Sequence, residues 1–287
     1  MSKGYIHLII ASIIIGSIGI FSRWINLPAP VQNFYRYLFA ALALASYLII
    51  NKDPLLRFRG NIKGLIGSSI SYAVASVLLF IGFNNTSIAN TVVLFYTAPL
   101  FVALLAPYFL REPLKKRTIV SLAIAFIGVL FLSLPTLGLN NGKEIIGIVA
   151  GLGSGIAFAL MIVSTKAVSA TLPFIRINFY QNLLAAVVLL PSAFSYHYTM
   201  SAKALGLLIV IGVVHTAIAR TLWVSGVSKV PAQDSGDVGY IEPLSAAVFG
   251  LIFFGEVPSA LGIVGAVLIL VSSYVVTKNP NKQLRAA

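Results

Sequence analysis

The sequence predicts an all-α integral membrane protein, with ten transmembrane helices arranged as two inverted five-helix repeats. Three observations lead to this prediction: the scarcity of charge, the number of long apolar segments, and an internal repeat with a near-constant offset. Of the 287 residues, 59% are hydrophobic and 9% are charged, and the mean hydropathy is +0.97. Soluble domains are about 25% charged, so this chain has too little charge to cover a water-facing surface.

Ten apolar segments are each long enough to approach the roughly 20 residues that a helix needs to cross a bilayer. Segments of this length must be helices, because lipid cannot satisfy the open edge of a strand. The loops between them are short, so no sizeable soluble domain is expected on either side. The expected spans are 5–23, 32–50, 63–82, 89–110, 118–135, 145–164, 174–193, 204–223, 236–254 and 259–277.

The net charge of +13 predicts an orientation in the membrane. Fifteen Lys and Arg residues lie in the termini and loops of one side, and three lie in the loops of the other. Because cytoplasmic loops are enriched in Lys and Arg, both termini are expected on the cytoplasmic side of a cell membrane. The basic charge therefore indicates topology and predicts no nucleic-acid partner. The chain has no Cys, which excludes disulfides and thiolate metal sites.

An internal repeat relates the two halves of the chain. A shift of 144 residues superposes identical residues, among them Gly82 and Gly226, Tyr96 and Tyr240, Pro99 and Pro243, Leu100 and Leu244, and Glu112 and Glu256. The two halves, residues 1–140 and 141–287, each hold five expected spans, so the second must cross the membrane in the opposite sense. Inverted repeats of this kind are typical of secondary transporters, whose substrate site lies near the middle of the membrane.

Two stretches of the repeat resemble the EamA repeat of the drug/metabolite transporter superfamily. They are Phe95-Tyr96-Thr97-Ala98-Pro99-Leu100 through Leu110-Arg111-Glu112-Pro113, and Gly239-Tyr240-Ile241-Glu242-Pro243-Leu244 through Gly255-Glu256-Val257-Pro258. Arg111 departs from the family pattern, because Gly usually precedes the Glu, and Ile15-Gly16-Ser17 stands where the family often has Trp-Gly. The resemblance implies ten helices, a central cavity lined mainly by helices 1–4 and 6–9, and alternating access. Members of the superfamily carry amino acids, nucleotide sugars, sugar phosphates, quaternary amines or drugs, so the resemblance leaves the substrate open.

Apart from those near the ends of the spans, four charged residues lie inside the membrane, where charge is costly and is a functional candidate by default. Arg36 and Arg220 could hold an anionic group with their guanidinium donors, although Arg36 could also extend to the outer interface. Arg220 and Asp237 are expected to form an ion pair between helices, as a gate or as a structural contact. Glu242 could hold a cationic group or a coupling proton, or accept a hydrogen bond from a tyrosine.

Polar and aromatic residues complete the predicted substrate site. Its further members are Tyr72, Ser76, Tyr96, Asn178, Gln181, His215 and Tyr240. The tyrosines could stack on a ring or hold an ammonium group, whereas serines could bond their own helix and a lone histidine is commonly a core residue. Thr216, Arg220 and Trp223 follow a helical spacing that predicts one shared face.

Proline and glycine give two further predictions about the helices. Pro99 and Pro243 predict kinks at matching depths of the two halves, and these kinks are candidate hinges. Gly147, Gly151 and Gly155 recur every four residues, which predicts a closely packed helix face.

The sequence contains no arrangement of residues typical of an enzyme, an ATP-driven pump or a metal site, and no cofactor is expected. A channel would require charge rings or a repeated filter sequence. The prediction is therefore a secondary transporter of small polar metabolites, which works by alternating access as a monomer in the lipid bilayer. Export of an amino acid or a related metabolite is the leading hypothesis. A nucleotide-sugar or sugar-phosphate antiporter and a quaternary-amine or drug carrier are the alternatives.

Overall fold

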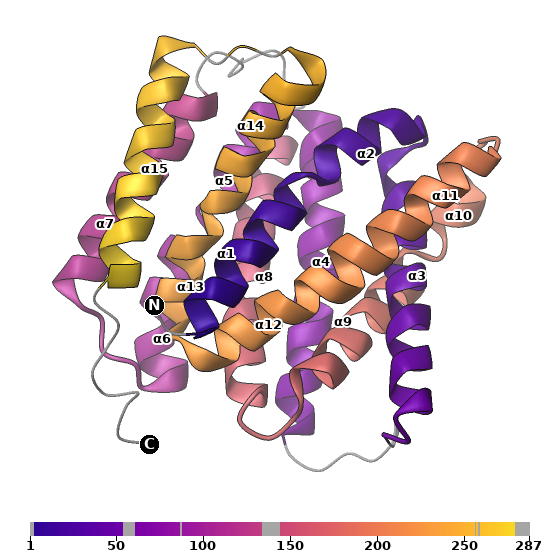
Figure 1. The fold of residues 1–287 in the computed structure, drawn as a ribbon, viewed down its shortest axis with the longest axis horizontal. Helices are drawn as coiled ribbons and strands as arrows, with labels where there is room; N and C mark the ends of the chain where they lie inside the picture. The colour runs from indigo at the N-terminus through magenta and orange to yellow at the C-terminus, as the bar shows by residue number, and fades with distance from the viewer. Residues whose placement is uncertain are drawn as a thin grey trace.

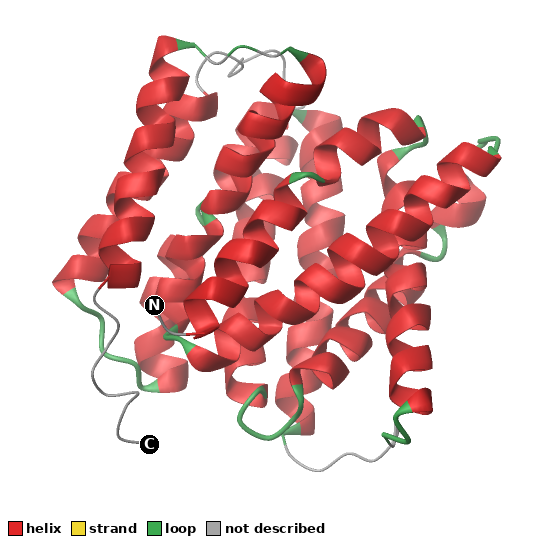
Figure 2. Cartoon of the chain, viewed as in Figure 1, coloured by secondary structure: helices red, strands yellow, loops and turns green. Residues whose placement is uncertain are grey.

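The chain forms a bundle of helices. The structure is a computed structural model, which describes residues 3–53, 61–86, 88–133, 144–255, 257 and 259–278. The described ranges are helices joined by short loops and turns (Figures 1 and 2). The elements are α1 Lys3–Gly16, α2 Ile18–Ile25, α3 Ala29–Ile50, α4 Ile62–Asn85, α5 Ile88–Phe95, α6 Ala98–Leu110, α7 Lys116–Ser133, α8 Glu144–Val168, α9 Phe174–Leu189, α10 Ser192–Ser195, α11 Ala202–Val210, η2 Ile211–Ala219, α12 Arg220–Lys229, α13 Ala232–Gly239, α14 Ile241–Phe254 and α15 Ala260–Lys278.

Eight helical segments of the described chain are long and apolar enough to cross a membrane. They are Lys3–Ile25, Ala29–Ile50, Ile62–Asn85, Thr91–Leu110, Glu144–Val168, Phe174–Ser195, Ala202–Lys229 and Ala232–Phe254. Each overlaps one of the predicted spans. The two other predicted spans, 118–135 and 259–277, coincide with α7 and α15, which pack against each other at one side of the bundle (Figure 1).

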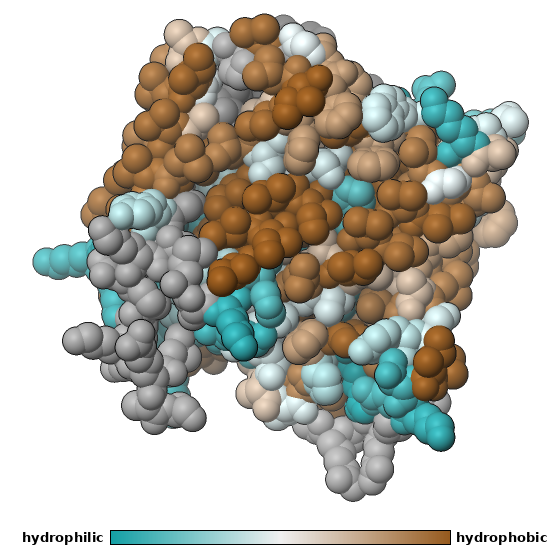
Figure 3. Space-filling model, viewed as in Figure 1, coloured by the Kyte–Doolittle hydropathy of each residue, from teal (hydrophilic) through white to brown (hydrophobic). Residues whose placement is uncertain are grey.

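The outside of the bundle is apolar, as expected for a protein surrounded by lipid. Ile50, Leu104 and Ile252 are 77%, 59% and 65% exposed. Hydrophobic residues cover most of the face drawn in Figure 3, and hydrophilic residues gather toward its edges. A soluble protein rarely exposes an apolar surface this extensive, so the predicted all-helical membrane fold is confirmed.

Two of the spans are broken at equivalent places. The span that contains α5 and α6 breaks at Tyr96 and Thr97, and the span that contains α13 and α14 breaks at Tyr240. Pro99 and Pro243 lie in the first turn after each break. Since proline cannot donate to the carbonyl four residues earlier and its ring clashes with it, the helix is interrupted just before the proline. The predicted kinks are therefore present, and their use as hinges stays a prediction.

Glycines allow several helices to approach closely. A Cβ atom on Gly147 would lie 2.7 Å from Thr86, one on Gly151 would lie 3.0 Å from Leu94, and one on Gly155 would lie 2.9 Å from the carbonyl oxygen of Leu94. The predicted glycine face of α8 is thus in tight contact with α4 and α5. Gly226 of α12 packs in the same way against α1, where its Cβ would lie 3.0 Å from the carbonyl oxygen of Gly4.

The ends of α6 and α14 share a left-handed residue that terminates the helix. Arg111 ends α6 with φ +55°, and Gly255 ends α14 with φ +68°. These two residues are separated by the repeat offset of 144. The structure therefore explains why the resembling family places Gly here, because only glycine adopts this conformation without strain. Glu256, which follows Gly255 and was matched with Glu112, lies outside the described residues.

Replacing Arg111 by Gly should stabilise the protein. The side chain of Arg111 is exposed, and removing the cost of a left-handed conformation is worth about 1 kcal/mol. We expect a rise of a few degrees in the melting temperature of the purified protein in detergent, with transport unchanged. A lower melting temperature for Arg111→Gly would show that this side chain makes a stabilising contact.

Candidate functional site

Arg220 of α12 lies at the centre of the bundle among aromatic rings. Its guanidinium carbon is 4.4 Å from the ring centre of Tyr72 and 4.6 Å from that of Trp223. The ring of Phe158 is 5.9 Å away. Arg220 is only 6% exposed. Cation–π contacts of this kind stabilise a desolvated guanidinium, but they leave its N–H donors free to bind an acceptor.

The hydrogen bonds of Arg220 are weak ones for a buried cation. One Nη2 contact is to the Sδ of Met161 at 3.1 Å, and another is to the Oε1 of Gln181 at 3.5 Å. The Nε of Arg220 has no partner. Gln181 is held in place by its own bond from Nε2 to the hydroxyl of Thr165, 2.8 Å long. A buried cation with unused donors is costly unless something anionic binds there.

Arg36 of α3 approaches the same centre through a chain of hydroxyl groups. Its Nη2 donates to the hydroxyl of Tyr37 at 2.7 Å, and this hydroxyl lies 2.7 Å from the Oγ of Ser76. The ring of Tyr37 packs edge-on against Tyr72, with centroids 5.3 Å apart. The Nε of Arg36 also lacks a partner. Arg36 is therefore linked through Tyr37 to the aromatic group around Arg220.

Glu242, near the start of α14, supplies the one carboxylate of this centre. Its carboxyl interacts with the hydroxyl of Tyr96 and lies within electrostatic range of Arg36 and Arg220. It makes no close ion pair with either arginine among the described residues. Arg36, Tyr96 and Glu242 keep partial exposure, whereas the residues behind them are buried. We call the group Arg36, Tyr37, Tyr72, Ser76, Tyr96, Phe158, Gln181, Arg220, Trp223 and Glu242 the central cluster.

The charges of the central cluster do not balance. Two guanidiniums face a single carboxylate, so the cluster carries one net positive charge when all three groups are ionised. Aromatic rings surround these charges and lower the local polarity, which strengthens electrostatic attraction to an incoming group. This arrangement suits a small ligand with an anionic group for the arginines and, beside it, a cationic or hydrogen-bonding group for Glu242.

A π-helical turn in the middle of one span positions Arg220. Between α11 and α12 the chain forms η2, and the side chain of Thr216 bonds the carbonyl of Ile211, five residues earlier, at 3.1 Å. Asn178 donates to the carbonyls of Thr216 and Ala217 at 3.2 and 3.1 Å. The structure therefore places Asn178 on the backbone of η2, where it satisfies carbonyl groups that the wider turn leaves available.

Two other predicted site residues, His215 and Tyr240, lie outside the central cluster, and so does Thr216 of the predicted helix face. His215 is 3% exposed and contacts the Oγ of Ser17 at 2.8 Å and the edge of Phe21. Tyr240 is fully buried behind Tyr96 and donates its hydroxyl to the carbonyl of that residue at 2.9 Å. The hydroxyl of Thr216 bonds the backbone of its own helix. Of the three residues predicted to share one helix face, only Arg220 and Trp223 therefore belong to the cluster.

The predicted ion pair between Arg220 and Asp237 is wrong. Asp237 faces α7 and α15, where the Oγ of Ser272 donates to its Oδ1 at 2.8 Å, and the Oγ of Ser121 lies 3.3 Å from both carboxylate oxygens. Arg220 faces α4 and α9 instead. The physical reason is that the position of a residue along its span does not determine the direction in which its side chain leaves the helix.

The helix ends on the side predicted to be cytoplasmic are joined by polar contacts. The carboxylate of Glu112 accepts a hydrogen bond from the backbone N–H of Ala232, the first residue of α13, at 2.8 Å. Lys166 donates to the carbonyls of Ser228 and Val230 at 3.1 and 2.6 Å. Burial raises the pKa of the Glu112 carboxyl, an effect that the bond from Ala232 and the charge of Lys166 partly offset. These contacts hold α6, α8, α12 and α13 together at one end of the bundle.

The model of the EamA-like transporter family matches the chain twice, over residues 2–134 and 145–278. The chain belongs to this family. It is therefore a multi-pass membrane transporter of the drug/metabolite transporter superfamily, which agrees with the resemblance seen in the sequence.

Relatives of this EamA-like transporter cover nearly its whole length. An uncharacterized transporter of Archaeoglobus fulgidus is 26% identical over 272 residues, which are 94% of each chain. An S-adenosylmethionine uptake transporter of Rickettsia bellii is 24% identical over 252 residues, 88% of this chain and 84% of the relative. A crystal structure with 13% identity matches with a TM-score of 0.85 and covers 96% of this chain and 98% of that one, which supports the fold.

Sequence reasoning missed Tyr37 and Phe158, two residues of this transporter's central cluster. Tyr37 directly follows Arg36, and this adjacency was the available signal, since an aromatic residue beside a buried arginine is a natural partner. Phe158 carried no signal, because it is one of 18 phenylalanines in an apolar sequence. It contacts Trp223 and Phe95, with ring centroids 6.1 and 4.9 Å away.

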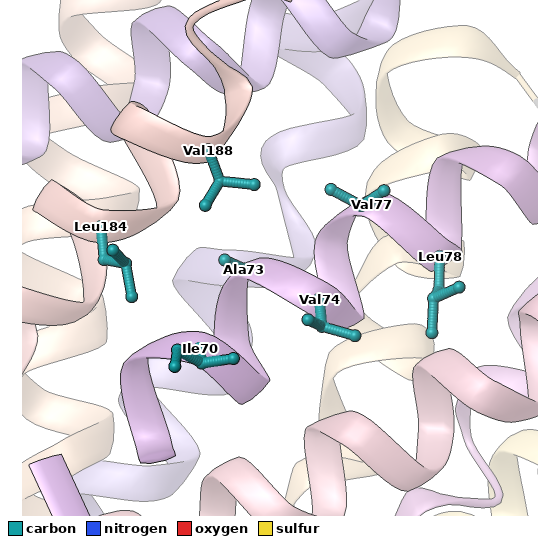
Figure 4. Close-up of a pocket in the computed structure, with 7 residues that line it drawn as sticks. All are labelled: Ile70, Ala73, Val74, Val77, Leu78, Leu184 and Val188. Carbon is teal, nitrogen blue, oxygen red and sulfur yellow. The ribbon is translucent and has the colours of Figure 1, made fainter. Parts of the chain in front are cut away.

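A separate apolar groove lies on the outside of the transporter, between α4 and α9. It has a volume of about 290 Å³, and its lining is entirely aliphatic (Figure 4): Ile70, Ala73, Val74, Val77, Leu78, Leu184 and Val188. None of these residues belongs to the central cluster. The groove has no polar group with which to select a polar substrate, so it is not a candidate for the transport site.

Proposed function

We propose that this protein is a secondary carrier that works by alternating access and exports a small zwitterionic metabolite, an amino acid or a close relative of one. The observation that carries the proposal is the charge arrangement of the central cluster. Arg36 and Arg220 have unused donors for a carboxylate, and Glu242 lies within their range as the partner of an ammonium group. An α-amino acid presents both groups a few ångströms apart.

The aromatic rings of the cluster extend the proposal to larger amino-acid derivatives. Several relatives are named as S-adenosylmethionine uptake transporters. It combines an α-amino carboxylate with an adenine ring and a sulfonium cation. We propose that Tyr72 and Trp223, whose rings lie beside Arg220, stack on such a ring or face such a cation. We therefore include S-adenosylmethionine in the proposed substrate class.

Alternating access requires two similar halves of the bundle, each of which can open one side of the membrane. We therefore propose that residues 1–140 and 141–287 form ten spans as inverted repeats. Several contacts support this. Tyr96 and Tyr240, separated by the repeat offset of 144, contact each other, with ring centroids 5.9 Å apart, as residues near a pseudo-twofold axis would. The helix ends at Arg111 and Gly255 have the same conformation. The family model also matches the chain in two successive segments.

Competition for uptake into proteoliposomes tests the substrate class. Labelled S-adenosylmethionine and a mixture of labelled amino acids serve as probes, and unlabelled amino acids, choline and a nucleotide sugar serve as competitors. We expect competition by compounds with an ammonium and a carboxylate. Competition by the nucleotide sugar alone would favour the antiporter alternative, which also fits the excess of arginine over carboxylate in the cluster. Competition by choline alone would favour an amine carrier. Efflux from preloaded cells that express the protein tests the direction.

Replacing Glu242 by Gln should weaken recognition of the ammonium group. A hydrogen bond to a charged group contributes about 1.5–3 kcal/mol, so we expect the apparent affinity to fall by about 10- to 150-fold, with partial recovery in Glu242→Asp. Uptake measured against substrate concentration gives this affinity. Glu144→Gln makes the same chemical change at the start of α8, outside the cluster, and should transport normally. Unchanged affinity and unchanged pH dependence in Glu242→Gln would remove Glu242 from the site.

A further inference from the structure

Asp237 forms a second polar site that is separate from the central cluster. Its carboxylate is fully buried where α13 meets α7 and α15, and Ser121 and Ser272 beside it are 1% and 0% exposed. The two hydroxyl oxygens lie 2.8 Å apart. Each hydroxyl also reaches the backbone of the opposite helix, since Ser121 Oγ lies 3.0 Å from the carbonyl of Ser272, and Ser272 Oγ lies 2.9 Å from the carbonyl of Ser121.

The negative charge of this site is not balanced by an ion pair within the described part of the chain, where Asp237 makes none. The ionisable groups that face it are Asp234 on its own helix, Arg117 from α7, Tyr5 from α1 and Tyr240 at the helix break. Asp234 shares its own hydrogen bond with Tyr5, at 2.5 Å. An ionised carboxylate in a buried site is strongly disfavoured without a compensating positive charge.

The site has fewer hydrogen-bond donors than acceptors, so it can take up one more proton. Two serine hydroxyls supply two hydrogens, whereas two carboxylate oxygens and two carbonyl oxygens compete to accept them. Adding one proton to Asp237 neutralises the charge and supplies a third donor. The oxygen–oxygen distances of 2.8–3.3 Å are those of hydrogen bonds. An alkali ion would have to separate these oxygens and enter between them, whereas a proton fits the distances as they are.

The equivalent place in the other half of the chain has no such site. This comparison rests on the proposed repeat. The offset of 144 relates Ser121 to Gly265, Ser272 to Gly128 and Asp237 to Val93. Gly128 and Gly265 also meet across α7 and α15, because a Cβ on Gly128 would lie 2.8 Å from the carbonyl oxygen of Gly265. The same helix crossing is thus packed at one end by two glycines and at the other by an aspartate with two serines. Helix packing alone does not require the carboxylate.

We propose that Asp237, Ser121 and Ser272 form a proton-binding site through which proton movement is coupled to transport. Asp237 takes up one proton from water through the end of α13 that carries Asp234, and it releases that proton when the contact of α13 with α7 and α15 opens. Loss of the proton leaves a buried charge among apolar helices, so the deprotonated state favours opening of this contact. The proton site and the substrate site lie on the same broken span, which links the two events mechanically.

Infrared spectroscopy of the purified protein in lipid nanodiscs tests the proposal without any substrate, so its result is independent of the proposed substrate class. Spectra are recorded from pH 9 to pH 5, in sodium and in potassium buffers of equal ionic strength. We expect a protonated-carboxyl absorption in the wild-type protein that is absent from Asp237→Asn and present in Glu242→Gln. In the double variant Ser121→Ala/Ser272→Ala this absorption should remain and move to higher wavenumber, because the acid loses its hydroxyl partners.

Two outcomes would overturn the proposal. If wild-type protein and Asp237→Asn had the same carboxyl absorption at every pH, Asp237 would not bind a proton in this range. If sodium removed the absorption at a pH where potassium did not, the site would bind sodium. Should Asp237→Asn fail to fold, the serine double variant decides, because an absorption that does not move in that variant comes from another residue.

Discussion

Arg220→Gln should lose transport and remain at least as stable as the wild-type protein. Truncating one partner of a desolvated charged contact costs about 2–5 kcal/mol, which corresponds to a loss of at least about 30-fold in transport at low substrate concentration. Stability should respond differently, because Arg220 is buried without a close carboxylate and has an unpaired Nε. Replacing Arg220 by a neutral residue removes the cost of burying a charge that has no close counter-ion.

The two measurements for Arg220 are initial uptake rate in proteoliposomes and melting temperature in detergent. Arg220→Lys keeps the charge but loses the planar fork and the stacking, so its transport should be intermediate. Arg111→Gly serves as the control, because Arg111 is an exposed arginine outside the cluster. Parallel losses of transport and melting temperature in Arg220→Gln would indicate a structural role for Arg220. Normal transport would exclude the proposed anion site.

Gly16→Ala should lower both stability and transport, whereas Gly19→Ala should do neither. A Cβ on Gly16 would lie 2.7 Å from the backbone oxygen of Glu242 and 2.7 Å from the Cβ of Ser245, so α14 would have to move. Nothing lies within 4 Å of a Cβ placed on Gly19. Overpacking of this kind costs about 1–3 kcal/mol, and it displaces the helix that carries Glu242.

Gly16→Ala and Gly19→Ala are the same substitution at two positions of one span, Lys3–Ile25. Alanine in place of an exposed helical glycine stabilises by up to about 1 kcal/mol, so Gly19→Ala should melt slightly above the wild-type protein. Gly16→Ala should melt several degrees below it, with uptake reduced about tenfold or more. Equal behaviour of the two variants would mean that the contact between α1 and α14 does not position Glu242.

The sequence was most informative about features with a direct physical signature. Membrane spans follow from apolar length, and the close packing of α8 follows from the spacing of Gly147, Gly151 and Gly155. The buried charges Arg36, Arg220 and Glu242 could be identified individually, because each interrupts an apolar segment. Their meeting in one cluster could be expected from the architecture of inverted repeats.

The directions of side chains could not be predicted, because they depend on local breaks in the helices. The sequence predicts an ion pair of Asp237 with Arg220, but Arg220 directly follows the π-helical turn η2, Asp237 lies just before the break at Tyr240, and the two side chains face different helices. No glycine or proline pattern indicated η2, so the structural role of Asn178 was also missed. Phe158, one of the three aromatic partners of Arg220, could not be predicted for a different reason, since phenylalanines are spread along the whole chain.

The proposed carrier has one substrate site that faces the two sides of the membrane in turn. Counterflow tests it most directly: proteoliposomes are loaded with unlabelled substrate, and entry of a trace of labelled substrate is followed with time. A carrier predicts a transient accumulation of label above its equilibrium level, which saturates with external substrate and is lost in Arg220→Gln. Label that rises to equilibrium without an overshoot, at a rate proportional to concentration, would show a channel and exclude alternating access.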